Sequence, residues 1–194
     1  YADSDPAVGA MVPLLHQPDG SKAHTFDTLV FDRHRYRDRA DEPDPEGPLC
    51  AEVLIGAVFC LRMTAIRGIG GFDPRIFLFF EDDDLCLRLR RAGWSLVVVP
   101  AARAVHIGAA SGRKSIAAFW ERHWHFSWSE HYFAEKHGGR TARAAMARRN
   151  LRQHTRSVLL GVMRRRPRTL LRSLANLSGT LAYVLGVPAS RTVG

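Results

Sequence analysis

Short apolar runs separated by charged stretches occupy the first hundred residues, a pattern typical of a sheet with helices packed against it. The run Val8–Leu15 ends before the turn sequence Pro-Asp-Gly at 18–20, so it predicts a strand followed by a turn. The longer run Val53–Leu61 is rich in β-branched residues and predicts one strand buried on both faces. Gly56 inside that run indicates a close approach to the backbone at this point.

Two helices and a further strand are predicted in the next forty residues. Residues 63–69 predict a short helix that ends at a Gly-Gly pair. Residues 81–92 predict a second helix with a glycine as its stop, and residues 96–99 predict a strand ended by Pro100. This succession of strands and helices predicts an α/β fold.

The C-terminal part of the chain is predicted to be helical. Residues 115–137 form an aromatic helix ended by a second Gly-Gly pair, and residues 140–169 continue as a strongly basic helical stretch. Residues 169–187 are apolar but interrupted by polar side chains, which makes them too polar and too short for a spanning helix to be assigned. Whether they insert into a membrane is left open.

A stripe of large apolar and aromatic side chains recurs at every fourth residue along the aromatic helix. The members of this stripe are Ile116, Trp120, Trp124, Trp128 and Tyr132. Such periodicity favours packing in a core or between helices. The surplus of tryptophan also suits an interface with lipid head groups.

The net charge of +9 is unevenly distributed along the chain. Residues 1–112 hold 12 Lys/Arg and 16 Asp/Glu, a balance of −4, whereas residues 113–194 hold 16 Lys/Arg and 3 Asp/Glu, a balance of +13. We therefore expect an acidic catalytic body followed by a basic surface for anionic partners. The three cysteines, Cys50, Cys60 and Cys86, are odd in number and widely spaced, which predicts reduced thiols and not a disulfide framework or a metal site.

Four consecutive acids, Glu81, Asp82, Asp83 and Asp84, stand between an aromatic run and the second predicted helix. Acids at a helix start interact favourably with the macrodipole and cap free N–H groups, which is their commonest role. Four exceed what capping needs, and packed together they repel one another and raise some pKa values. A carboxylate so placed can act as a general base. Asp84 is also spaced to pair with Arg88 one turn later.

Two motifs in this region resemble the acceptor-site signature of family-two glycosyltransferases. They are Gly-Gly-Phe-Asp at 70–73 and Phe-Glu-Asp-Asp-Asp-Leu-Cys-Leu-Arg-Leu-Arg-Arg-Ala-Gly at 80–93, and the similarity is strongest to bacterial rhamnosyltransferase-like members. Gly-Ala at 56–57 and Val-His at 105–106 match the same pattern in order and spacing. Residues 5–20 resemble the segment that follows the nucleotide-binding half of these enzymes.

The resemblance implies a GT-A fold, a Rossmann-like α/β sandwich, of which this chain would supply the acceptor-side half, followed by C-terminal helices. Residues 1–112 would be the acceptor and catalytic half, residues 113–139 an aromatic helix on or next to it, and residues 140–194 a basic, partly apolar helical tail. Family members also carry an N-terminal donor-binding half with an Asp-rich motif. We see no such motif in this chain, so we expect a fragment, or half of a split enzyme, that is inactive alone.

By this resemblance the protein is an inverting glycosyltransferase of the hexosyltransferase class. It would move a sugar from a nucleotide-diphosphate donor to a lipid-linked or polysaccharide acceptor in cell-envelope glycan synthesis. Asp82 aligns with the catalytic base, which removes the proton of the acceptor hydroxyl. Glu81 would hydrogen-bond the acceptor, and Asp84 would orient the site or simply cap the helix. The other implied acceptor-binding residues are Gly56, Gly71, Phe72 and Asp73, although Gly-Gly also serves simply to end a helix.

His106 resembles the family histidine that helps to hold Mg²⁺ or Mn²⁺ on the donor diphosphate, where the metal would neutralise charge on the leaving group. A lone histidine after a strand is more often structural. Arg113 and Lys114 could reach the donor diphosphate, but they equally fit a solvated loop.

The basic stretch 140–168 is compatible with an anionic membrane surface, which places the protein peripherally on the cytoplasmic face of the inner membrane. Nucleic acid would attract the same charges, but no nucleic-acid-binding motif accompanies them, so none is expected as a partner. A merely solvated basic helix stays possible. The alternative to an enzyme is a non-catalytic membrane-surface or partner-binding module, in which the basic tail matters and the acidic cluster does not.

Overall fold

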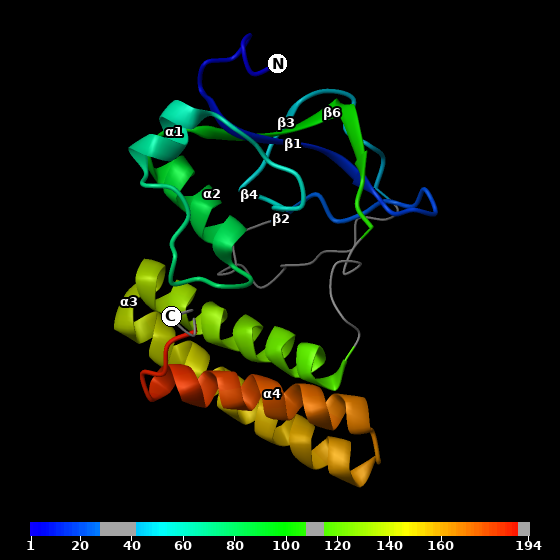
Figure 1. The fold of residues 1–194 in the computed structure, drawn as a ribbon, viewed down its shortest axis with the longest axis vertical. Coiled ribbons are helices and arrows are strands. Elements are labelled where there is room, and N and C mark those ends of the chain that lie inside the picture. The colour runs from blue at the N-terminus through cyan, green and yellow to red at the C-terminus, as the bar shows by residue number, and fades with distance from the viewer. Residues whose placement is uncertain (28–41, 108–114, 190–194) are drawn as a thin grey trace. The chain divides into compact units, whose positions relative to one another are not determined.

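The computed structural model describes residues 1–27, 42–107 and 115–189. The chain divides into two compact units (Figure 1). The first contains residues 1–73 and 82–111, and the second contains residues 74–81 and 112–194. A short segment in the middle of the sequence therefore belongs with the C-terminal helices.

The first unit is built on a mixed four-stranded sheet with the strand order β3-β6-β1-β5. The long strands β1 (Val8–His16) and β6 (Ser95–Val105) run parallel. The short strands β3 (Leu49–Cys50) and β5 (Cys60–Leu61) pair antiparallel with β6 and β1. A mixed α/β unit followed by long helices confirms the predicted fold class.

One face of this sheet carries the core of the first unit. Every second residue of β1 contributes a buried side chain to it, namely Ala10, Val12 and Leu14, as expected for a strand with period two. The helices α1 (Met63–Gly68) and α2 (Glu81–Arg91) cover this face, and α2 contributes Leu85 and Leu89, which share one side of the helix. Both helices lie where the sequence predicts them.

The predicted strand over residues 53–61 is wrong, because the structure contains two short strands there. β4 (Val53–Leu54) pairs with β2 (Phe26–Asp27) in a separate two-stranded sheet, whereas β5 belongs to the main sheet. A turn begins at Gly56 between them. The backbone N–H of Gly56 donates to the Asp82 side chain of α2, so the close approach predicted at this glycine is confirmed, although its partner could not be predicted from the local sequence.

The predicted end of a strand at Pro100 is also wrong, since β6 continues to Val105. Its register with β1 shifts between the pairs Pro13–Val99 and Leu14–Arg103. The missing N–H of Pro100 falls inside this irregularity, where no ladder hydrogen bond is needed. Figure 1 shows β6 turning sharply in its second half.

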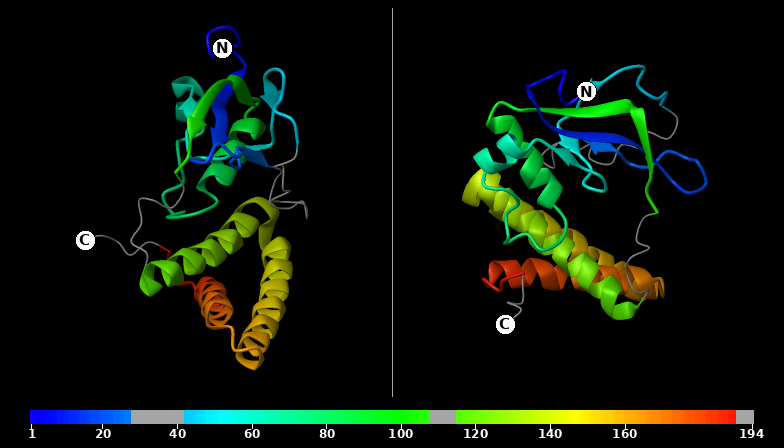
Figure 2. Two further views of the ribbon diagram at one scale, coloured as in Figure 1. Left: turned by 90° about the vertical axis from the view of Figure 1, so that its right-hand side faces the viewer. Right: turned by 45° about the horizontal axis from the view of Figure 1, so that its top comes forward.

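The second unit is helical. α3 (Ile116–Met163) is capped at its N-terminus by Ser115, whose hydroxyl accepts a hydrogen bond of 3.0 Å from the N–H of Ala118. Gly139 interrupts α3 with φ 74° and ψ −175°, which confirms the predicted stop after the aromatic helix. α4 (Pro167–Val184) then packs along α3, and Figure 2 shows it beside both halves of that helix.

Packing of the aromatic stripe is confirmed only for part of its length. Trp128 is 6% exposed, and its indole N–H donates a hydrogen bond of 2.7 Å to the carbonyl of Val187, but Ile116 is 74% exposed. A spacing of four residues exceeds the helical repeat of 3.6, so the stripe rotates by about 40° per step around the helix. It therefore faces the packing partner over only part of α3.

A buried polar group joins α3 to α4. The Thr180 hydroxyl lies 2.9 Å from the Ser127 hydroxyl and 3.1 Å from Nε2 of His131, and all three side chains are buried. A Cβ at Gly179 would lie 2.3 Å from the carbonyl oxygen of Trp124, so the helices meet here with almost no space between them. Among the described residues, no helix is both long and apolar enough to cross a bilayer.

Candidate active site

The carboxylate of Asp82 is held in place at the start of α2. Its Oδ2 accepts a hydrogen bond of 3.1 Å from the N–H of Gly56, and its Oδ1 accepts one of 3.0 Å from the N–H of Asp83. The side chain is half-buried, so it is fixed but reachable from solvent. A fixed, accessible carboxylate is a group that can act as a general base.

Gly56 lies close to Asp82 through its Cα as well as through its N–H. A Cβ at this position would lie 3.3 Å from Cβ of Asp82 and 3.2 Å from Cε2 of Phe59. Only a glycine fits here without displacing a neighbour. The structure therefore brings together two residues, Gly56 and Asp82, that the sequence assigns to the same site.

Asp84 is fully buried and connects α2 to the end of α1. Its Oδ2 accepts a hydrogen bond of 2.8 Å from Nε of Arg88, which confirms the predicted pair one helical turn apart. The same guanidinium donates through Nη1 to the carbonyl of Ile69, at 2.9 Å. The ion pair thus ties the acidic helix to the residue that precedes the Gly-Gly-Phe-Asp motif.

The Gly-Gly-Phe-Asp motif forms a tight turn that presents an aromatic ring. Gly70 and Gly71 have φ angles of 78° and 75°, in the left-handed region where side chains are rarely tolerated. The N–H of Gly71 donates to the carbonyl of Ile66 and closes the end of α1. Phe72 beyond it is 46% exposed, and Asp73 is half-buried. The turn ends a helix, which confirms one interpretation of the glycine pair, and it displays Phe72; the predicted place of this turn beside an acceptor stays a prediction.

The residues just before Asp82 adopt an unusual backbone. Phe79 and Phe80 have φ angles of 63° and 69°, a conformation that costs a bulky residue on the order of 1–3 kcal/mol. Within the second unit, the Phe80 ring packs 5.3 Å from that of Phe126 and 5.7 Å from that of Phe133. Strain of this kind is maintained only when surrounding contacts impose it, and here aromatic packing on α3 imposes it on the entry to α2.

Glu81 is the first residue of α2 and is half-buried. It follows the strained pair directly and precedes Asp82, so its backbone position is set by the same packing. Its predicted contact with an acceptor stays a prediction.

Asp82 and His106 are not joined by a hydrogen bond or an ion pair. His106 is exposed after the end of β6, where its backbone N–H donates to the carbonyl of His16. The predicted role of His106 in holding a metal stays a prediction.

The residues that the structure describes contain no group of three or more His, Cys, Asp or Glu side chains able to hold a metal ion. By themselves these residues do not fit a complete Mg²⁺ or Mn²⁺ site, which needs several oxygen ligands. Arg113 and Lys114, predicted near the donor diphosphate, lie outside the described residues.

Sequence reasoning overlooked the positioning roles of Cys86 and Phe80. Cys86 is fully buried, and its sulfur lies 3.4 Å from the backbone nitrogen of Leu54, just before the turn at Gly56. Burial raises the pKa of this thiol to about 12. All three cysteines are free, as predicted. For Phe80 the available signal was an aromatic doublet placed directly before four acids.

A mixed α/β unit whose acidic helix begins beside a glycine turn is the framework on which this site is built. The chain matches the glycosyltransferase-like family 2 over residues 6–170 and belongs to this family.

Curated relatives include rhamnosyltransferases. The chain is 32% identical over 152 residues to the N-acetylglucosaminyl-diphospho-decaprenol L-rhamnosyltransferase of Mycobacterium tuberculosis, covering 69% of this chain and 48% of that protein. It is 35% identical over 81 residues to the rhamnosyltransferase WbbL of Escherichia coli K12, covering 42% of this chain and 30% of that one. The chain thus spans about half the length of the mycobacterial relative and less of WbbL. No solved structure matches it significantly.

Proposed function

We propose that the full-length protein carrying this chain transfers a sugar from a nucleotide-diphosphate donor to an acceptor hydroxyl, with inversion and with Asp82 as the general base. The supporting observation is the geometry of Asp82, a half-buried carboxylate fixed by the N–H of Gly56. Membership of the glycosyltransferase family 2 supplies the reaction class.

The proposed reaction requires one base. Asp82 takes the proton of the acceptor hydroxyl as that oxygen forms a bond to the anomeric carbon. The bond from the anomeric carbon to the diphosphate breaks, and the nucleoside diphosphate leaves from the opposite face, which inverts the configuration. A general base of this kind contributes roughly 10²–10⁴-fold to the rate.

The acceptor is proposed to lie against the turn at Gly71 and Phe72. The exposed ring of Phe72 offers an apolar face to a sugar ring, and the family resemblance adds Asp73 and Glu81 as residues that would bind its hydroxyls. The Asp84–Arg88 pair holds this turn in register with Asp82. The Gly-Gly turn and the acidic helix would thus act together as the acceptor side of the site.

The substrate class rests on the similarity to rhamnosyltransferases, one of which is named for an N-acetylglucosaminyl-diphospho-decaprenol acceptor. We infer a hexosyl or deoxyhexosyl donor and a lipid-linked or polysaccharide acceptor in cell-envelope glycan synthesis. We propose that the binding site for the donor nucleotide is formed by the full-length protein and not by this chain alone. His106 would contribute one ligand to a Mg²⁺ or Mn²⁺ ion held mainly by the donor diphosphate.

The decisive experiment replaces the base and leaves the surrounding charge pattern intact. In the full-length enzyme, Asp82→Asn should lower kcat by a factor on the order of 10²–10⁴ while donor affinity, measured by calorimetry, stays within twofold. Glu52→Gln, which neutralises a carboxylate outside the site, is the matched control and should leave kcat unchanged. Transfer retained by Asp82→Asn would refute the assignment of the base.

A further inference from the structure

The last part of the chain has no acidic residue of its own. No Asp or Glu occurs after Glu135, and all the charges of residues 136–194 are basic. The two nearest carboxylates are already engaged: Glu130 accepts from Arg149 at 2.9 Å, and Glu135 accepts from Arg143 at 3.2 Å. The arginines farther along the chain therefore lack local acids that could neutralise them.

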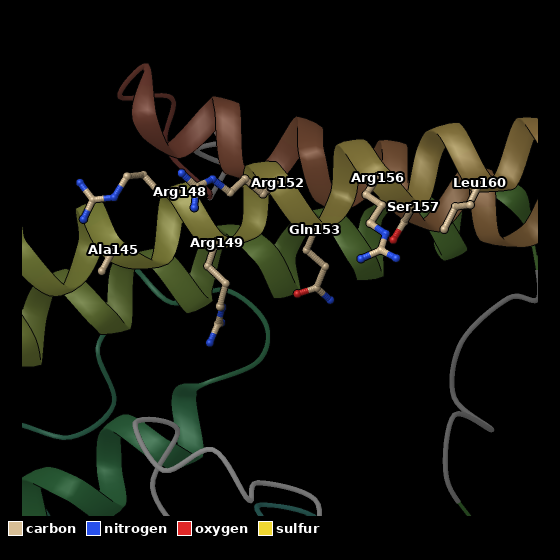
Figure 3. A pocket seen from close by; sticks show the side chains of 8 residues that line it. All are labelled: Ala145, Arg148, Arg149, Arg152, Gln153, Arg156, Ser157 and Leu160. Atoms are coloured by element: carbon tan, nitrogen blue, oxygen red, sulfur yellow. The ribbon is translucent and has the colours of Figure 1, made fainter.

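Three of these arginines line one side of α3. Arg148, Arg152 and Arg156 are exposed and follow one another at intervals of four residues, so they share a helix face. Figure 3 shows their side chains along a shallow hollow on α3, together with Arg149. A row of exposed guanidinium groups is an attractive surface for phosphate groups.

The arginine face leads to an apolar tip at the end of α3. Leu159, Val162 and Met163 are 60%, 59% and 78% exposed, although they are large apolar side chains. Leu159 and Met163 lie three and seven residues after Arg156, which keeps them on the same side of the helix. The turn that follows consists of Arg164, Arg165 and Arg166, all exposed. Exposed apolar side chains next to arginines suit a membrane surface, where an apolar acyl-chain region lies beneath a layer of phosphate groups.

We propose that the α3–α4 turn docks the protein on an anionic phospholipid bilayer. Val162 and Met163 enter the boundary of the acyl chains, and residues 164–166 lie at the level of the phosphates. A helix at such an interface places its apolar side chains just below the head groups and its basic side chains among them. This inference does not depend on the proposed transferase activity.

The chemistry of the tip disfavours other occupants. A second copy of the chain that presented the same face would bring two arginine rows of the same sign together, which is repulsive. A nucleic acid would pair with the arginines, but it would leave Val162 and Met163 exposed to water. Only a surface that is anionic outside and apolar beneath satisfies both sets of side chains.

Flotation of the purified chain with vesicles tests the proposal. Vesicles of equal parts phosphatidylglycerol and phosphatidylcholine should bind the chain, and vesicles of phosphatidylcholine alone should not. Each arginine near an anionic surface contributes about fivefold in affinity. Changing residues 164–166 from Arg to Glu should therefore weaken binding on the order of a hundredfold or more, while changing them to Lys should largely preserve it.

Two matched controls separate specific docking from bulk charge. Arg140→Glu alters the same charge at the far end of the same half of α3, so it should weaken binding much less than Arg164→Glu. Met163→Ser keeps the charge and removes an exposed apolar group, so it should weaken binding several-fold with unchanged circular dichroism.

The proposal would be overturned by equal binding to uncharged vesicles, by no vesicle binding at all, or by an equal loss from Arg140→Glu and Arg164→Glu. If Met163→Ser left vesicle binding unchanged while the chain bound duplex DNA in a salt-sensitive manner, the surface would be a nucleic-acid site and the membrane proposal would fail.

Discussion

The backbone N–H of Gly56 donates a hydrogen bond of 3.1 Å to Oδ2 of Asp82, across 26 residues of sequence. This contact places a turn of the sheet unit against the first turn of α2. It leaves the carboxylate half-buried and gives it one orientation. The position of the proposed base is therefore set by the main chain, which is stiffer than a side chain would be.

A methyl group at Gly56 should disturb the base without removing it. Gly56→Ala would place Cβ 3.3 Å from Cβ of Asp82 and 3.2 Å from Phe59, so Asp82 must shift by a few tenths of an ångström. We expect kcat to fall roughly 10-fold to 100-fold, because small displacements of reacting groups are costly, with donor affinity unchanged. Steady-state kinetics and donor calorimetry check this. An unchanged kcat would show that the contact does not position the base.

The buried Asp84–Arg88 pair should contribute strongly to the stability of the fold. Arg88→Met removes the cation beside a fully buried carboxylate and the contact with Ile69. The free energy of unfolding should fall by about 3–5 kcal/mol, the usual result of breaking a buried pair from one side. The double variant Asp84→Asn with Arg88→Met should recover part of that loss. Urea unfolding measures both, and a loss below about 1 kcal/mol in the single variant would rule out this role.

Gly179 should be indispensable to the packing of α4 on α3. In Gly179→Ala the new Cβ would lie 2.3 Å from the carbonyl oxygen of Trp124, which is backbone and moves only with its helix. We expect destabilisation of at least 1–3 kcal/mol. Gly68→Ala is the control, because nothing lies within 4 Å of a Cβ there; it should be neutral or slightly stabilising. Similar melting temperatures for the two variants would contradict the close approach.

The buried histidine of α3 should make stability depend on pH. Burial, assisted by Arg149, His154 and Arg143, lowers the pKa of His131 to about 4 from 6.5. A depressed histidine pKa means that the unfolded chain binds a proton first. The stabilisation is therefore complete above about pH 6.5 and is lost as the pH falls towards 4, by an amount on the order of 3 kcal/mol.

His131→Gln should remove this component. Urea unfolding of both proteins between pH 4 and 7 gives the comparison, with the wild type losing more stability on acidification than the variant. His123, His125 and His154 also have lowered pKa values and will leave a smaller slope in both proteins. Parallel curves for the two proteins would show that His131 titrates normally.

The sequence predicts those parts of the fold that depend on local spacing. α2, its stop at Gly93 and the Asp84–Arg88 pair follow from helical periodicity, and the break at Gly139 follows from a Gly-Gly pair. The predicted strand over residues 53–61 is wrong because a turn begins at Gly56, whose N–H donates a hydrogen bond to Asp82. The predicted end of the strand at Pro100 is also wrong, because Pro100 lies in a register shift between β6 and β1, where no N–H is needed for a ladder hydrogen bond.

The sequence shows the residues of the candidate site as motifs but does not show the contacts that position them. The acids and the Gly-Gly turn are visible as motifs, so their identity could be read directly. The packing of Phe80 on Phe126 and Phe133 could not be predicted in this way, because these two residues lie about fifty positions later in the sequence. The pattern of the helix that carries them does not single them out as partners of Phe80. The roles of His106, Arg113 and Lys114 stay predictions.

The grouping of residues 74–81 with the C-terminal helices has a consequence for dissecting the gene. The polypeptide passes from the sheet unit to the helical unit, returns at Asp82, and leaves again after Ser111, so three covalent links join the two units. Ending the gene at residue 111 would not release an intact sheet domain. It would strip Phe79 and Phe80 of the rings they pack on, and the helix bearing the carboxylate would begin from an unsupported, strained entry.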